Sequence, residues 1–91
     1  MRKKKELFIP EAPIKRGAMG HSVILLQIVL DHILKEKGRR KLVDTEPGHY
    51  GPYTEKSVRL FQERYGIFVC GTYTPTMRLR IKEVLNADRN I

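Results

Sequence analysis

The sequence lacks several features that would place it in a particular class of protein. It has a single cysteine, Cys70, among 91 residues, which excludes an internal disulfide or a cysteine-based metal cluster. Its longest apolar run, 23–30, is interrupted by a glutamine and is far shorter than the roughly 18 residues that span a bilayer. Few apolar residues separate the basic start, 2–5, from Pro10, so the apolar part of a secretory signal is missing. We therefore expect synthesis in the cytoplasm, without a membrane span or a signal peptide.

Catalytic and metal-binding patterns are also missing. The histidines, His21, His32 and His49, lie in separate segments, so they do not have the ligand spacing of a zinc site. Paired carboxylates within one motif, a Ser/His/Asp arrangement and a Cys/His arrangement are all absent from the sequence. We therefore expect no enzymatic activity, no cofactor and no metal.

Negative charge is scarce. Lys and Arg number 18 against 10 Asp and Glu, a net charge of +8 that favours anionic partners such as nucleic acid, lipid headgroups or wall polymers. The positive residues form runs at 2–5 and 39–41 and are otherwise scattered, a pattern that equally suits solvated ends and loops. No DNA- or RNA-reading motif accompanies the runs, so nucleic-acid binding through them is the least favoured function, behind the two given at the end of this section.

The length allows one domain, and the 41% of hydrophobic residues is typical of a folded one. Residues 1–14 are expected to form a basic, proline-containing arm, with 7–9 as an apolar clasp on the folded body. The domain itself is expected over 15–86, followed by a short tail, 87–91.

Apolar periodicity predicts three helices. The first is expected from about Ser22, its cap, to about Lys37, and the second from its cap Thr54 to about Tyr65, each stopped by a glycine. In the third, Thr74 serves as the cap and Pro75 takes the first helical position. The predicted apolar faces are Val23, Leu26, Leu30, Ile33 and Leu34, then Val58, Phe61 and Tyr65, and then Met77, Ile81, Val84 and Leu85.

Two helix starts repeat each other. Ser22-Val23-Ile24-Leu25-Leu26-Gln27 matches Ser57-Val58-Arg59-Leu60-Phe61-Gln62 in its Ser, Val, Leu and Gln positions. Two such helices would pack about a pseudo-twofold axis and a third would close the core. The expected fold is therefore all-α, a compact three-helix bundle with glycine-rich loops.

These helix starts belong to a larger set of motifs that run in order along the chain. They are Lys15-Arg16-Gly17-Ala18-Met19-Gly20, Val23-Ile24-Leu25-Leu26-Gln27-Ile28-Val29-Leu30, Gly48-His49-Tyr50-Gly51-Pro52-Tyr53-Thr54, Ser57-Val58-Arg59-Leu60-Phe61-Gln62, Gly66-Ile67, Gly71 and Thr74-Pro75. This set, which covers 15 to about 85, resembles the peptidoglycan-binding domain appended to bacterial and phage cell-wall hydrolases. The resemblance implies a three-helix fold, no catalysis, and binding to the stem peptide or glycan of murein.

The loop around Tyr50 is the candidate ligand site. Gly48 and Gly51 bracket Tyr50, so the chain can turn sharply and present an aromatic ring. Tyr50 suits a core anchor and a ligand platform equally well, whereas Tyr53 is expected to be exposed. The two glutamines are expected to satisfy loop backbone groups more than to touch ligand. The candidate ligand-binding residues are Tyr50, His49, Gly51, Tyr53, Gln62 and Gln27.

The first helix is apolar nearly all round, which indicates burial on more than one side. Either the arm or the long loop covers its extra face, or the face is a protein interface formed by Ile24, Leu25, Ile28 and Val29; we favour the interface, in a homo-oligomer or a larger assembly. The leading hypothesis is a stand-alone module that binds the cell wall and targets or anchors a partner. The alternative is a structural component that reuses the fold, for example in a phage tail or virion.

Overall fold

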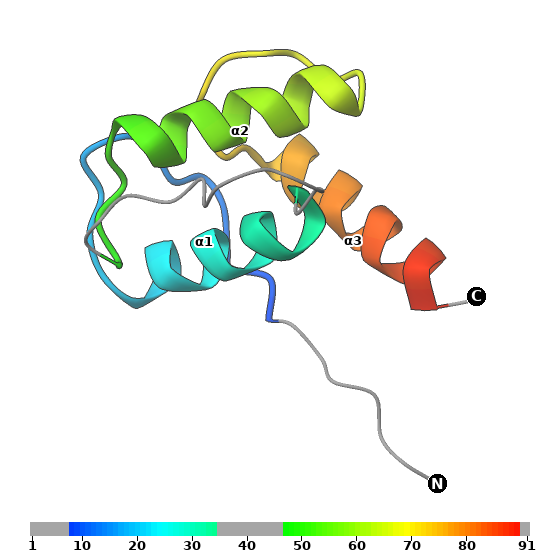
Figure 1. Ribbon diagram of the computed structural model, residues 1–91, viewed down its shortest axis with the longest axis horizontal. Helices are drawn as coiled ribbons and strands as arrows, with labels where there is room; N and C mark the ends of the chain where they lie inside the picture. Colours follow the sequence, from blue (N-terminus) through cyan, green and yellow to red (C-terminus); the bar gives the residue numbers. More distant parts are fainter. Residues whose placement is uncertain (1–7, 35–46, 90–91) are drawn as a thin grey trace, which may run out of the picture.

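The computed structural model describes residues 8–34 and 47–89, which fold into the helices α1 (His21–Leu34), α2 (Pro52–Arg64) and α3 (Pro75–Arg89). In Figure 1, α1 and α2 lie one above the other and run in the same direction, while α3 packs at their far end. Strand pairing within the described residues is limited to isolated bridges, Ile14 with Tyr73 and Met19 with His49. The expected all-α, three-helix fold is confirmed. None of the described helices is long and apolar enough to cross a membrane.

The start of α1 differs by one residue from the prediction. The helix begins at His21, and the carbonyl oxygen of Gly20 accepts from the backbone N–H groups of Val23 at 3.1 Å and Ile24 at 3.2 Å. Gly20 has a φ of +122°, which lets the chain turn into the helix there. Ser22 is therefore an exposed helical residue and not the cap. The predicted last turn, 35–37, lies outside the described residues.

The predicted cap of α2 is wrong, and that of α3 is right. Helix α2 begins at Pro52, with Gly51 in the cap position and no side-chain cap. Proline suits this first helical position because its φ is already helical and it has no N–H that needs a partner. The hydroxyl oxygen of Thr54 instead accepts from Gln27 Nε2 at 2.9 Å. In α3, Thr74 Oγ1 accepts from the N–H of Met77 at 3.2 Å, as expected for a cap. Helix α3 continues to Arg89 and so includes part of the predicted tail.

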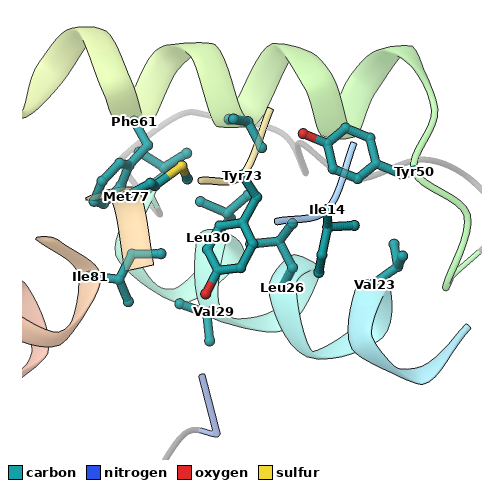
Figure 2. Packing of buried hydrophobic residues seen from close by; sticks show 12 residues of the cluster. Ile14, Val23, Leu26, Val29, Leu30, Tyr50, Phe61, Tyr73, Met77 and Ile81 are labelled. Atoms are coloured by element: carbon teal, nitrogen blue, oxygen red, sulfur yellow. The ribbon is translucent and has the colours of Figure 1, made fainter. Parts of the chain in front are cut away.

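The predicted apolar faces meet in one core, shown in Figure 2. Most of their members are fully buried, and the remainder, including Tyr65 and Leu85, pack partly buried at its edge. Burying one large apolar side chain contributes about 1.5–3 kcal/mol, so these contacts dominate the stability of the fold. The buried apolar residues are Ile14, Val23, Leu26, Val29, Leu30, Leu34, Tyr50, Val58, Phe61, Tyr73, Met77 and Ile81.

The segment before α1 takes part in this core. Ile14 is buried and exchanges backbone hydrogen bonds of 3.0 and 2.8 Å with Tyr73, just ahead of α3. The carbonyl oxygen of Pro10 accepts from the Tyr73 hydroxyl at 2.7 Å and from Arg78 Nε at 3.0 Å. Of the expected apolar clasp, 7–9, Ile9 is partly buried against the core and Phe8 is exposed, while residue 7 lies outside the described residues. Residues 9–14, part of the expected arm, therefore pack as part of the folded domain.

Candidate ligand-binding site

Gln27 of α1 fixes the loop that leads into α2. Its Oε1 accepts from the N–H of Gly48 at 2.9 Å, and its Nε2 donates to the carbonyl of His49 at 3.0 Å and to Thr54 Oγ1 at 2.9 Å. The side chain is buried, so these bonds replace the water that its amide would otherwise need. The expectation that Gln27 satisfies loop backbone groups is confirmed.

Gln62 of α2 does the same for the loop that leads into α3. Its Oε1 accepts from the N–H groups of Cys70 and Gly71, both at 3.0 Å, and its Nε2 donates to the carbonyl of Thr72 at 2.9 Å. The same Nε2 lies 3.7 Å from the sulfur of Met77. Each glutamine thus binds a glycine N–H and the next carbonyl, and then reaches the first turn of the following helix.

These contacts reveal a second repeat that sequence reasoning missed. Gly48-His49-Tyr50-Gly51-Pro52 and Gly71-Thr72-Tyr73-Thr74-Pro75 share the pattern Gly-x-Tyr-x-Pro, each directly ahead of a helix. Both leading glycines are in the left-handed region, with φ of +87° and +80°. The pattern is present in the sequence, but the matching helix starts predict a repeat that involves α1 and α2 alone.

The tyrosines of the two turns are core residues. Tyr50 and Tyr73 are fully buried, and each hydroxyl donates to a backbone carbonyl. Figure 2 shows both rings among the apolar side chains of the core. Burial raises the pKa of both hydroxyls well above its usual range, and for Tyr50 the nearby Glu55 and Cys70 add to the effect. Of the two roles expected for Tyr50, the core anchor is the one that the structure shows. Its ring offers no surface on which a sugar could pack.

The remaining accessible candidates are His49 and Tyr53. Tyr53 is 54% exposed in the first turn of α2, as expected, and His49 is partly buried in the turn before it. Met19, which is exposed, pairs with His49 in an isolated bridge, and the N–H of Gly20 donates to the carbonyl of Gly48 at 2.9 Å. His49 and Tyr53 therefore stand on a backbone that is fixed from two sides, by Gln27 and by the segment before α1. Gly51, between them, is buried.

No protein-family profile and no curated protein matches the sequence. Among solved structures, the chain is similar to the crystal structure of SleB N-terminal domain, a peptidoglycan-binding domain, with 32% sequence identity and a TM-score of 0.64. The similarity covers 80% of this chain and 92% of that one. The chain belongs to the peptidoglycan-binding domain family.

In this peptidoglycan-binding domain, the residues predicted as a protein interface do not form one exposed face. Val29 is buried in the core, and Ile24 and Leu25 are partly buried. Ile24 packs over the turn before α2, with its Cγ1 3.1 Å from the position that a Cβ would take on Gly48. Ile28 is 48% exposed and is the most accessible of the four.

The other predicted binding features of the domain lie partly outside the described residues. Both basic runs, 2–5 and 39–41, fall there, and with them the proposed nucleic-acid contacts. Within 8–34 and 47–89, no group of three or more His, Cys, Asp or Glu side chains is placed to hold a metal ion.

Proposed function

We propose that this peptidoglycan-binding domain is a non-catalytic module that binds the murein of the bacterial wall and thereby holds a partner there. The observation that supports the proposal best is the 32% identity with the SleB N-terminal domain over 92% of that domain. The ligand would be the stem peptide or the glycan, and the site of action the cell wall. We assign contact to the accessible pair His49 and Tyr53.

The chemistry of this pair suits a polar ligand. The half-exposed ring of Tyr53 offers an apolar face for a sugar ring or an alanine methyl group, with a hydroxyl at its edge. The imidazole of His49 can donate to a carboxylate or a sugar hydroxyl. Because the His49 carbonyl is bonded to Gln27, little backbone ordering is needed on binding.

Co-sedimentation with purified sacculi tests the proposal. The wild-type domain should pellet with the sacculi, and His49→Ala with Tyr53→Ala should weaken binding by about tenfold, the loss of one aromatic contact and one hydrogen bond. Phe68→Ala is the matched control, because it removes an exposed aromatic ring from the turn between α2 and α3. A wild-type domain that stays in the supernatant contradicts the function. A double variant that binds like the wild type contradicts the assignment of His49 and Tyr53.

A second candidate function is a structural one, in which the fold serves as an assembly component, for example of a phage particle. The half-exposed Ile28 on α1 is the observation that favours it. Ile28→Glu should then abolish self-association or docking, measured by light scattering, while leaving the monomer folded. A wild type that is monomeric and acquires no partner on cross-linking contradicts this role.

A further inference from the structure

Two arginines, Arg16 and Arg59, contact the same carboxylate, that of Glu55, close to the turn between α2 and α3. Glu55, in the first turn of α2, contacts Arg16 Nη1 through Oε1 at 2.9 Å and Arg59 Nη2 through Oε2 at 3.5 Å. The arginine side chains are 57% and 51% exposed, whereas that of Glu55 is 23% exposed. The carboxylate is thus more buried than the two guanidinium groups, and the three side chains together carry a net positive charge.

The backbone beneath both arginines is fixed. Arg16 stands in a short turn in which the N–H of Ala18 donates to Lys15 O at 3.0 Å and the N–H of Gly17 donates to Tyr50 O at 2.9 Å. Arg59 stands in the middle of α2. The Glu55 carboxylate and Arg59 lie directly over Gly71, where an added Cβ would come within 2.8 Å of Glu55 Oε2 and 3.0 Å of Arg59 Nε. The absence of a side chain at Gly71 leaves the space that the carboxylate and Arg59 occupy.

The fold itself does not require charge at this place. Counted back from the two equivalent glutamines, Arg59 corresponds to Ile24 and Glu55 to Gly20. In the first repeat, Ile24 and the carbonyl of Gly20 are the nearest atoms above Gly48, just as Arg59 and Glu55 are above Gly71. An aliphatic side chain covers the first turn, whereas an ion-paired set covers the second. Exposed ion pairs of this kind contribute little to stability.

Guanidinium groups arranged in this way fit one kind of ligand. Each carries five N–H donors, and the contacts with Glu55 use one nitrogen of each group. The planar fork of donors matches the paired oxygens of a carboxylate or a phosphate, and prior ordering lowers the entropic cost of binding. We propose that Arg16 and Arg59, oriented by Glu55, bind an oxyanion group of the wall polymer. This assignment rests on the proposed function for the polymer and adds two contact residues to His49 and Tyr53.

The oxyanion can come from two sources in a wall, the carboxylates of the stem peptides or the phosphates of attached polymers. Titration of the isotope-labelled domain with inorganic phosphate and with acetate, followed through the arginine Nε–Hε signals by NMR, tests the site without any wall. At constant ionic strength, the Arg16 and Arg59 signals should shift and saturate, while chloride and the reference signal of Arg64 show neither effect. Shifts that are absent, or equal at Arg64, overturn the site.

Co-sedimentation with sacculi then tests whether the two arginines contribute to wall binding. Arg16→Lys with Arg59→Lys keeps the net charge of +8 and loses the planar forks, so binding should weaken by roughly tenfold. Arg64→Lys, on the same helix, should bind like the wild type. A double variant that binds like the wild type overturns the role of the pair on the wall. A wild type that fails to bind sacculi contradicts the proposed function, while the NMR titration still judges the site.

The chemistry of the sacculi identifies the source. Amidation of the peptide carboxylates should abolish the difference between wild type and double variant if carboxylate is the ligand. Removal of phosphate polymers with hydrofluoric acid should abolish it if phosphate is. A difference that survives both treatments overturns the oxyanion assignment.

Discussion

The hydroxyl group of Tyr50 donates a 2.6 Å hydrogen bond to the carbonyl oxygen of Gly71, so the turn before α2 is fastened to the turn before α3. The hydroxyl of Tyr73, the equivalent residue of the second turn, donates in the same way to Pro10 in the segment before α1. The turns of this small domain are therefore tied together through its core. Because each of these hydrogen bonds is made by one buried hydroxyl, a Tyr→Phe substitution can remove it without changing the packing of the ring.

Tyr50→Phe should lower the free energy of unfolding by about 1–2 kcal/mol, because the Gly71 carbonyl loses its buried partner while the ring stays in place. Urea denaturation monitored by circular dichroism measures the change. Tyr53→Phe is the control, since that side chain is half exposed and its loss should cost less than about 0.5 kcal/mol. Equal effects of the two substitutions would show that the Tyr50 hydroxyl bond contributes nothing measurable.

Stability should fall in alkaline solution. Burial raises the pKa of Tyr50 and Tyr73 in the folded state, so as the pH rises through about 10 the unfolded chain loses these protons first. The stabilising effect is complete below that pH, and above it each tyrosine should remove about 1.4 kcal/mol per pH unit. Urea titrations between pH 9 and about 11 measure the slope. Tyr73→Phe should reduce the tyrosine part of the slope by half, and an unchanged slope would contradict the assignment.

The helices were predictable because their signals are local. Apolar residues recur with a helical period in all three, and the Thr74-Pro75 start of α3 matches the expected cap. The start of α2 was not predictable in this way, because the role of Thr54 depends on Gln27, which lies far away in the sequence. The Thr54 hydroxyl has the sequence context of a helix cap but accepts a hydrogen bond from the Gln27 amide. No local sequence pattern reveals this contact.

The candidate site was less predictable than the fold for the same reason. An aromatic ring between two glycines suits a core anchor and a ligand platform equally well, and the bond from Tyr50 to Gly71 settles which one it is. Likewise, Arg16 and Arg59 meet through one carboxylate although 16 and 59 belong to separate segments. Side chains brought together by tertiary packing leave no spacing in the sequence to recognise.

Removal of the amide at the second turn should be costly. Gln62→Leu preserves the volume of the side chain but leaves the N–H groups of Cys70 and Gly71 without their acceptor and removes the 2.9 Å donor to the carbonyl of Thr72. We expect a loss of about 2–4 kcal/mol in the free energy of unfolding, measured by urea denaturation. Lys82→Leu, at an exposed position of α3, provides the control and should change it by less than about 0.5 kcal/mol. A loss below about 1 kcal/mol for Gln62→Leu would mean that water replaces the amide and that Gln62 is not essential to the turn.

Alanine substitution at three glycines separates backbone strain from crowding. Gly66, Gly48 and Gly71 all have positive φ, so each substitution should cost about 1–3 kcal/mol in strain. At Gly66 nothing lies within 4 Å of the added Cβ, whereas at Gly48 the Cβ would meet Ile24 Cγ1 at 3.1 Å, so Gly48→Ala should be the more destabilising of the two.

At Gly71 the crowded atoms include the ends of Glu55 and Arg59, which can swing away into solvent. Gly71→Ala should therefore cost no more than Gly48→Ala in thermal unfolding, yet it should displace Glu55 and change the Arg59 Nε–Hε signal. An unchanged signal in a folded Gly71→Ala variant would contradict the close packing of the ion-paired set on this turn.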